Sequence, residues 1–458
     1  MRYDVIVTGS GPGGYVAAIC AAQHKFKTAL VEYSDAGGVC LNRGCIPAKT
    51  LLKSVSVLEN CRHAGEYGII AGECNPDIEK IVARARNVSQ TMSRGVDFLL
   101  KKNGIYLIRG HGRLLAPDTM EIDGNKTITA SHIILATGAR PKELPNLPID
   151  EKYVKSYKTA LFPEHIPASM LVVGSGAIGT ELACFYNAVG TKVTMVEYLP
   201  RIVPLEDEDV SAQLSRSLRK SGIRVMTDSS VDSLVVGSNG CTASISTKKG
   251  KETAVYEQIL SAVGVTANIE NLGLETLGVE IINGKIATDR FYRTNVEGVY
   301  AIGDVIATPS LAHVASAEAI VCVEKIAGVG VPPIDYTNIP SCIYTNPEIA
   351  SVGLTEKQAT ESGLPFRVGK FPYTASGKAA ATGCRDGFVK LLFDNNSDKL
   401  IGAHLVGSGV TEMIAGLVAA KKFELTAAQL HSIIHPHPTM SEAIMEAAAA
   451  AHNQCIHL

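Results

Sequence analysis

A glycine-rich motif that occurs twice in the chain constrains its fold more than any other feature. The motif reads GSGPGG at 9–14 and GSGAIG at 174–179, and each copy follows an apolar run and precedes an Ala-rich helical run. An acid closes the next predicted strand in both copies, Glu32 and Glu197, and the interval between the last glycine and the acid is the same in each. Such glycines let a pyrophosphate approach a helix N-terminus closely, and the acid accepts hydrogen bonds from a ribose diol. One copy would be weak evidence, but two copies in full context predict two Rossmann-like dinucleotide-binding domains.

Composition and charge limit the kinds of partner. The 458 residues, 46% hydrophobic and 19% charged, are typical of an α/β enzyme, and a chain of this length is expected to form roughly two to four domains. The formal net charge is -2 and no basic cluster occurs, so we expect no binding to nucleic acid. The apolar stretch 315–331 is interrupted by charged residues, so we expect no membrane span.

The first residues and the cysteines bear on the location of the protein. The chain leads straight into a predicted strand, without a pattern typical of a secretory or transit peptide. Its 11 cysteines are an odd, scattered set, unlike the dense disulfide framework of a small secreted protein. We therefore expect a cytoplasmic protein in a reducing compartment.

Strands, turns and linkers divide the chain into four segments. A predicted strand at 133–136 ends in a turn, and the Pro-containing stretch 141–148 resembles a linker. Residues 298–304 form a predicted buried strand that we expect to return to the first domain. Beyond about 336, strand-like stretches followed by Ala-rich helices are typical of a separate α+β domain. The predicted segments are a first nucleotide-binding domain at 1–145, a second at 146–265, a central segment at 266–335 that returns to the first, and an α+β domain at 336–458.

Two cysteines five residues apart, Cys40 and Cys45, stand just before a predicted helix at 50–58. Pro47 suits the first helical position, which would place Cys45 at or just before the helix N-terminus, where free N–H groups and the helix dipole favour a thiolate. In regular helix the rise alone separates residues at this spacing by roughly 7.5 Å. That exceeds the Cα separation of about 4.4 to 6.8 Å that disulfides allow. A disulfide here would need a distorted backbone, which Gly44 can supply.

Two other interpretations of this pair stay open on the residues alone. Zinc sites usually have two to four residues between paired ligands and need a second pair, and no second pair occurs nearby, so we expect no metal. Two buried structural cysteines would also account for the residues, since free cysteine is common in protein cores. The predicted helix start beside Cys45 argues against that interpretation.

Further motifs follow in order along the whole chain. They are CLNRGCIPAK at 40–49, ATG at 136–138, GD at 303–304, LAH at 311–313, YTNPE at 344–348 and HPHPTMSE at 435–442. With these motifs the chain resembles the pyridine nucleotide-disulfide oxidoreductases, and within that family the branch that oxidises dihydrolipoyl groups. The resemblance implies an α/β fold with two Rossmann-like domains, one for FAD and one for NAD, and a C-terminal α+β dimerisation domain.

The resemblance assigns the first glycine motif to FAD and the second to NAD. The implied FAD-binding residues are Gly9, Gly11, Gly14, Glu32, Lys49, Gly112, Ala136, Thr137, Gly138, Asp304 and Ala312. The implied NAD-binding residues are Gly174, Gly176, Gly179, Glu197 and Gly264, and Glu181 matches the acid that pairs with Lys49 beside the flavin. A carboxylate at position 197 would repel the 2'-phosphate of NADP, which favours NAD.

The resemblance also implies the chemistry. Taken alone, His437 would equally suit a surface turn, but in the family motif it is the acid/base, and Glu442 orients its imidazole. The family brings this histidine to the cysteines of the other subunit, which implies a homodimer. In the implied reaction His437 deprotonates a dihydrolipoyl thiol, which attacks Cys40 of a Cys40–Cys45 disulfide. Cys45 leaves as a thiolate against the flavin, and the electrons pass through FAD to NAD.

Several residues depart from the family pattern. Val39, Arg43 and Ala48 replace residues that are more usual beside the cysteines, and VTAN at 265–268 replaces the more common Gly-Arg-x-Pro-Asn pattern. None of these changes removes a reacting group. The change at 265–268 leaves the local nucleotide contacts open.

Three rival functions can be weighed against the residues present. A glutathione-type reductase would need a basic residue in the first helix, and 15–22 has none. A mercuric reductase would need two adjacent cysteines near the C-terminus, where only Cys455 stands. A non-catalytic flavin-binding subunit would not need Cys40, Cys45 or His437, and all three are present. The implied partners are dihydrolipoyl groups of 2-oxo acid dehydrogenase complexes or of a glycine cleavage carrier protein, and no motif indicates which.

Overall fold

The two copies of the glycine motif form two matching strand–helix–strand units. The computed structural model describes residues 1–237 and 240–458. The elements are β1 (Arg2–Thr8), α1 (Pro12–Gln23) and β2 (Thr28–Glu32) in the first unit, and β9 (Ser169–Val173), α6 (Ala177–Ala188) and β10 (Lys192–Val196) in the second. Helices α1 and α6 have the same length and the same position relative to their glycines, and both pairs of strands are parallel. The repeat seen in the sequence is therefore confirmed in the backbone.

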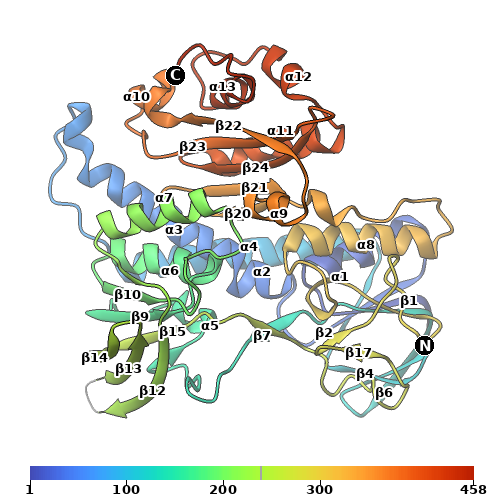
Figure 1. The fold of residues 1–458 in the computed structure, drawn as a ribbon. Helices are drawn as coiled ribbons and strands as arrows, with labels where there is room; N and C mark the ends of the chain where they lie inside the picture. Colours follow the sequence, from blue (N-terminus) through green and yellow to red (C-terminus); the bar gives the residue numbers. More distant parts are fainter. Residues whose placement is uncertain (238–239) are drawn as a thin grey trace.

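The first unit is built on a mainly parallel sheet (Figure 1). Its strands run in the order β3-β2-β1-β6, β19 pairs in parallel with β6, and β5 and β4 continue the sheet in antiparallel fashion. The bounds are β3 (Tyr106–Arg109), β4 (Gly112–Ala116), β5 (Thr119–Ile122), β6 (Lys126–Leu135) and β19 (Val299–Ala301). A small hairpin of β17 (Ile281–Ile282) and β18 (Lys285–Ile286) precedes β19. Strand β19 thus returns the central part of the chain to the first sheet, while the limits of the four predicted segments stay predictions.

The second unit repeats this design. Its parallel strands run in the order β11-β10-β9-β15-β8, and β12, β13 and β14 form an antiparallel sheet beside them. The bounds are β8 (Val154–Lys155), β11 (Arg224–Met226), β12 (Ser230–Gly237), β13 (Gly240–Thr247), β14 (Gly250–Tyr256) and β15 (Gln258–Ser261), with helices α5 (Tyr157–Ala160) and α7 (Glu208–Lys220). Antiparallel strands β7 (Ala139–Pro141) and β16 (Val265–Ala267) join the two units.

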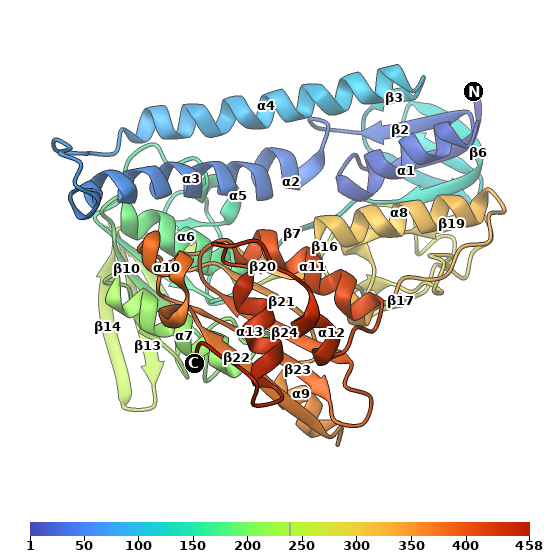
Figure 2. The ribbon, with the colours of Figure 1, turned by 90° about the horizontal axis from the view of Figure 1, so that it is seen from above.

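Long helices tie the two units together. Figure 2 shows α3 (Cys45–Arg62) and α4 (Ile78–Lys102) running side by side as a hairpin, with the short helix α2 (Gly38–Arg43) before α3. Helix α3 packs against α6 of the second unit, and α1 packs against α8 (Ala312–Ile326). Helix α3 therefore begins in the first nucleotide-binding unit and ends beside the second.

The C-terminal part forms a third body above both units (Figure 1). It is an antiparallel sheet in the order β20-β21-β24-β23-β22, covered by α11 and α13. The bounds are β20 (Ser341–Ile343), β21 (Ile349–Gly353), β22 (Phe366–Pro372), β23 (Phe388–Asp394) and β24 (Leu400–Val406) for the strands, and α9 (Glu356–Glu361), α10 (Gly377–Ala381), α11 (Val410–Lys422), α12 (Ala427–Ser432) and α13 (Glu442–Ala450) for the helices. Sheet and helices share one apolar core, which confirms the α+β class predicted for this part.

A buried lysine holds the C-terminal body against the second unit. The Lys390 side chain in β23 is only 3% exposed, and its Nζ lies 2.8 Å from Oδ1 of Asp207, the N-cap residue of α7. Glu356 at the start of α9 also pairs with Lys390, at 2.6 Å. Since a buried charge is stable only with its partners, this cluster fixes how the two bodies meet.

Within residues 1–237 and 240–458, every helix is too short or too polar to cross a membrane.

Candidate active site

A continuous cavity of roughly 1850 Å³ lies where the two nucleotide-binding units meet the C-terminal body. Most of the residues selected from the sequence line it: Gly9, Gly11, Glu32, Cys40, Cys45, Lys49, Gly112, Ala136, Thr137, Gly138, Gly174, Gly176, Glu181, Glu197, Gly264, Asp304 and Ala312. The cavity therefore joins the two glycine motifs to the cysteine pair.

The glycines of the first motif have distinct structural roles. Gly9 has a φ of 91°, and a Cβ on it would overlap the carbonyl oxygen of Ala136. A Cβ on Gly14 would overlap the carbonyl oxygen of Gly9, which explains why Gly14 lies beneath the cavity wall and does not line it. Gly11, the N-cap of α1, has open space where a Cβ would be. Gly9 and Gly14 close the turn, and Gly11 leaves room beside the helix N-terminus for a pyrophosphate.

The second motif has the same geometry. Gly174 has a φ of 97° and packs on the carbonyl of Ala262, Gly179 packs on the carbonyl of Gly174, and Gly176 at the N-cap of α6 faces open space. Gly264, with a φ of 108°, follows the strand that packs on this turn. Two equivalent sites for a pyrophosphate therefore face one cavity.

The two acids are held by the same hydrogen bonds in both copies. Glu32 accepts from the N–H and hydroxyl of Ser10 at 2.8 and 2.7 Å and from the N–H of Ser34 at 2.7 Å. Glu197 accepts from the N–H and hydroxyl of Ser175 at 2.9 and 2.6 Å and from the N–H two residues on at 2.9 Å. Both carboxylates are thereby fixed at the end of a strand. Sequence reasoning missed the serines, although their place in both copies of the motif was a visible signal.

The other residues assigned to the flavin lie around the first motif. The turn 136–138 packs on Gly9, and a Cβ on Gly112 would lie 2.7 Å from Sδ of Met120 on the neighbouring strand β5 and 2.9 Å from the hydroxyl of Thr8 at the end of β1. Asp304 follows β19, where burial raises the pKa of its carboxyl group. Ala312 is the first residue of α8. These positions come from three separate stretches of the chain and meet only in the folded molecule.

The cysteine pair stands at a break between two helices. Cys40 lies in α2, and Cys45 is the first residue of α3, with Gly44 between the helices. The helix thus begins at Cys45, as expected from its place near the helix N-terminus, and five residues before the predicted run 50–58. Pro47 occupies its third position and not the first, as we had expected. A Cβ on Gly44 would lie 3.0 Å from the carbonyl oxygen of Val39, which leaves little room for a larger residue at the break. Both cysteines are free thiols in this structure.

The two thiols are electrostatically different. A hydrogen bond with Cys40 lowers the pKa of Cys45 to about 7 despite burial, with further help from the positive charge of Lys49. The same hydrogen bond, with burial, raises the pKa of Cys40. Of the two thiols, Cys45 at the helix N-terminus is therefore the one that ionises more easily.

An ion pair sits one helical turn beyond Cys45. The Nζ of Lys49 lies 2.7 Å from Oε2 of Glu181 in α6, as the resemblance led us to expect. Glu181 also accepts from the N–H of Tyr344 at 3.0 Å, and the ring of Tyr344 faces Nζ of Lys49 at 4.5 Å. The first unit, the second unit and the C-terminal body therefore all contribute to the surroundings of the Cys45 thiolate.

The predicted base and its orienting acid form a pair away from this cavity. Nδ1 of His437 lies 2.8 Å from Oε1 of Glu442, and the other carboxylate oxygen accepts from the N–H of Thr439 at 2.8 Å. These hydrogen bonds outweigh the effect of burial and lower the pKa of Glu442. The His437 side chain is 79% exposed, and neither residue lines the cavity that contains Cys40. Within one chain the structure does not bring the base to the cysteines.

The residues that depart from the family pattern do not close the site. Val39 and Arg43 line the cavity beside the cysteines, together with Ala48. In the stretch 265–268, Asn268 donates to the carbonyl of Thr137 at 2.9 Å and so links the turn of the first unit to the second.

The chain belongs to the pyridine nucleotide-disulphide oxidoreductase family. Residues 3–319 match this family, and residues 339–448 match its dimerisation domain, which supports a homodimer. The family implies a flavin and a pyridine nucleotide as cofactors.

Within the family, the similarity to dihydrolipoyl dehydrogenases is confirmed over the full length. The chain is 45% identical to the dihydrolipoyl dehydrogenase of Rhizobium etli, covering 99% of both chains. It is 46% identical to the enzyme of that name from Zymomonas mobilis, covering 100% of this chain and 99% of the relative.

Solved structures agree on the fold. The crystal structure of LpdA from Mycobacterium tuberculosis superposes with a TM-score of 0.90 at 27% identity, covering 97% of this chain and 99% of that one. The flavoprotein disulfide reductase RclA of Escherichia coli gives a TM-score of 0.88 at 24% identity over 98% of this chain and 99% of that one, which shows a shared fold. The predicted architecture, two nucleotide-binding domains and a C-terminal dimerisation domain, is confirmed.

Proposed function

We propose that this protein oxidises protein-bound dihydrolipoyl groups to the lipoyl disulfide, with NAD as the electron acceptor and FAD as the intermediate carrier. The observation that carries the proposal is the Cys40–Cys45 pair, which opens into a cavity lined by both glycine motifs. Relatives that are 42 to 46% identical and named dihydrolipoyl dehydrogenase supply the substrate class.

The residues present fit both cofactors. Gly11 and Gly176 have open space at the N-termini of 12-residue helices, where N–H groups can bind a pyrophosphate. Glu32 and Glu197 hold a carboxylate at the strand end, where each can accept hydrogen bonds from a ribose. We assign the first site to FAD because it adjoins Cys45, and the second to NAD because Glu197 would repel a 2'-phosphate. The bound flavin and nicotinamide supply the two-electron chemistry that the side chains lack.

The cysteines exchange a disulfide with the substrate. One dihydrolipoyl thiolate attacks Sγ of Cys40, which breaks the Cys40–Cys45 bond and leaves Cys45 as a thiolate. The second dihydrolipoyl sulfur then attacks its partner, which forms the lipoyl disulfide and releases Cys40. The protein is left with two thiols and the substrate with one disulfide, so the electron pair has moved to the protein. The low pKa of Cys45 suits the leaving role.

His437 removes the proton from the attacking thiol, and Glu442 holds the imidazole in place. Since His437 is exposed and outside the cavity of its own chain, we propose that it serves the cysteines of the partner subunit in a homodimer. Two composite sites would then form, each with cysteines from one chain and the histidine from the other.

The substrate is proposed to be uncharged at its reacting end. Helix α1 carries no basic residue, as an anionic peptide such as glutathione disulfide would require. The physiological partner would be a lipoyl-bearing protein of a 2-oxo acid dehydrogenase complex or of glycine cleavage, and a cytoplasmic location remains our prediction.

Anaerobic titration of the purified holoenzyme tests the proposal. Addition of dihydrolipoamide should produce a long-wavelength absorbance band from the Cys45 thiolate beside oxidised flavin, and NAD should discharge it. Rapid turnover with glutathione disulfide and none with lipoamide would exclude the proposed substrate. Full lipoamide activity in a Cys45→Ser variant would exclude the disulfide mechanism.

A further inference from the structure

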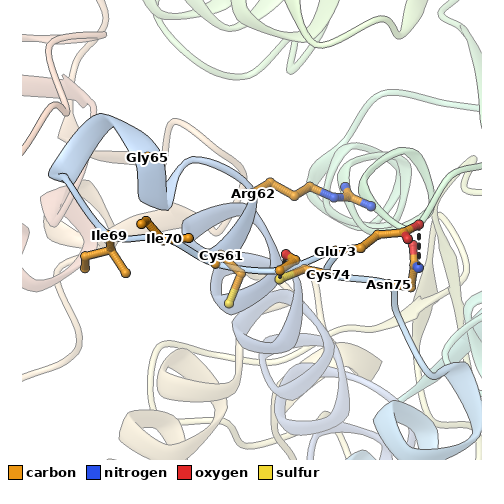
Figure 3. Close-up of a pocket in the computed structure, with 10 residues that line it drawn as sticks. Cys61, Arg62, Gly65, Ile69, Ile70, Glu73, Cys74 and Asn75 are labelled. Carbon is orange, nitrogen blue, oxygen red and sulfur yellow. Dashed lines mark hydrogen bonds between the residues drawn. The ribbon is translucent and has the colours of Figure 1, made fainter.

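Two more thiols lie together where helix α3 meets helix α4. Cys61 is in the last turn of α3, and Cys74 is in the extended stretch that leads to α4. Both line a surface cavity of roughly 630 Å³, together with Arg62 and Glu73, and Figure 3 shows the two cysteines next to each other at this cavity. The Cys74 thiol also donates to the carbonyl of Gly72 at 3.4 Å. Backbone and side-chain placement thus bring the two thiols to one surface site.

The two thiols interact directly. Burial, the charge of Cys61 and a hydrogen bond with Cys61 raise the pKa of Cys74, while the positive charge of Arg62 opposes this rise. The Arg62 guanidinium is held beside the site by a 2.7 Å bond to the carbonyl of Ala188.

A second pair of neighbouring cysteines shows how burial distinguishes an unreactive pair from Cys61 and Cys74. The charge of Cys20 in α1 acts on Cys322 in α8, but Cys322 is fully buried, and burial raises the pKa of both thiols. A thiol of that kind reacts slowly, because the thiolate is the nucleophile and an oxidant cannot reach it. Cys61 and Cys74 instead face a surface cavity, where a small disulfide can reach them.

We propose that Cys61 and Cys74 form a second dithiol/disulfide couple, which low-molecular-weight disulfides oxidise and which closes the α3–α4 connection into a covalent loop. The Cys61 thiolate attacks one sulfur of the small disulfide, which gives a mixed disulfide on Cys61 and one free small thiol. The Cys74 thiol, whose pKa is raised, loses its proton and attacks the Cys61 sulfur second, which forms the Cys61–Cys74 bond and releases the second small thiol. Two protein thiols are oxidised and one small disulfide is reduced to two thiols.

The new couple is separate from the catalytic pair. Cys45 is the first residue of α3 and Cys61 is the last but one, so the helical rise places the two roughly 24 Å apart along the helix axis. Direct exchange between the pairs is therefore excluded, and the proposal does not depend on the proposed function. The closed loop would contain Tyr67, whose hydroxyl donates to the carbonyl of Thr382 in the C-terminal body at 2.9 Å. Oxidation would thus restrain the contact between the hairpin and that body.

Peptide mapping of the holoenzyme tests the couple. The protein is incubated with glutathione disulfide, its remaining thiols are alkylated, and it is digested with trypsin without reduction. Cleavage after Lys53, Arg62 and Lys80 separates the two cysteines, so the disulfide should link the peptides 54–62 and 63–80. The linked pair should disappear in Cys61→Ser and in Cys74→Ser. It should persist in Cys384→Ser, a matched control with a half-buried thiol that donates to the carbonyl of Thr382.

Three results would overturn the proposal. They are an absence of any linked peptide, a mixed disulfide on Cys61 that never proceeds to the Cys74 link, and a link between two copies of the chain through Cys61 or Cys74, seen as a dimer band on a non-reducing gel. As a second measurement, the Cys61→Ser and Cys74→Ser variants should turn over lipoamide within twofold of wild type, because the catalytic pair is distant. A large loss of turnover in either variant would show that the two pairs are not separate.

Discussion

Replacing Lys49 by methionine should raise the pKa of the Cys45 thiol by about one unit. That pKa is lowered from 9.0 to about 7, a difference equivalent to about 3 kcal/mol in favour of the thiolate. The hydrogen bond with Cys40 is the main cause, and Lys49 is the charged group that opposes the effect of burial.

The size of the Lys49 contribution follows from its position one turn along α3. Side chains at this spacing lie about 6 Å apart, where two unit charges interact by about 2.8 kcal/mol at an effective dielectric constant of about 20. The Lys49 side chain is 34% exposed and paired with Glu181, so we halve this value for solvent screening. About one pKa unit remains, and the midpoint should move from about 7 to about 8.

The assay is an anaerobic pH titration of the long-wavelength band in the dithiol-reduced holoenzyme, after its flavin content has been matched to wild type. Lys49→Arg keeps the charge and should keep the midpoint. Glu181→Gln should lower the midpoint, because its carboxylate raises the Cys45 pKa. The double variant Lys49→Met/Glu181→Gln should lie between the single variants. An unchanged midpoint in Lys49→Met, with the band still lost in Cys45→Ser, would refute this account of thiolate stabilisation.

Three further outcomes are expected. Gly179→Ala should raise KM for NAD at least tenfold with the flavin content unchanged, because the new Cβ would overlap a backbone carbonyl oxygen of the second motif only; equal loss of both cofactors would contradict this. Glu442→Gln should lower kcat by about a hundredfold, since the imidazolium form of His437 loses the negative charge of its partner although the amide oxygen can still accept, and unchanged turnover would show that the pair has no catalytic part. Lys390→Met should cost about 3 to 5 kcal/mol in urea unfolding, because the Asp207 side chain, 1% exposed, keeps a buried charge. Burial acts to raise the Asp207 pKa, but the hydrogen bond with Lys390 outweighs it and lowers that pKa. The stability that the ion pair contributes is therefore present above the unfolded pKa of about 3.9 and is lost as the pH falls through the folded value. A loss of stability on raising the pH instead would contradict this account of the Asp207–Lys390 pair.

Local features followed closely from the sequence. The helices after Gly11 and Gly176 begin where the glycines place them, and both end at equivalent positions of the repeat. The serines that hold Glu32 and Glu197 repeat as well, because the same short sequence bends the backbone in the same way. The prediction of where α3 begins was less accurate. That start depends on the break at Gly44, whereas proline in the first turn is compatible with more than one helix start.

Contacts between distant segments could not be inferred in this way. Arg62 binds the carbonyl of Ala188, and Tyr67 binds that of Thr382, although nothing in the local sequence of either residue signals its partner. The Cys61–Cys74 neighbourhood is of the same kind, because it depends on the path of the chain between two helices. Such contacts arise from side-chain packing, which has no sequence period of its own.

The sequence by itself determined the two nucleotide-binding units, the place of Cys45 near a helix start and the family, since each rests on short motifs whose backbone geometry is local. Only the tertiary structure decided that both glycine motifs open into one cavity, that Tyr344 joins the Lys49–Glu181 pair, and that His437 stays outside the cavity of its own chain. The physical reason is that a motif sets the bend of the chain around it. The distance between two motifs is set by how sheets and helices pack, and that packing keeps His437 away from the cysteines of its own chain.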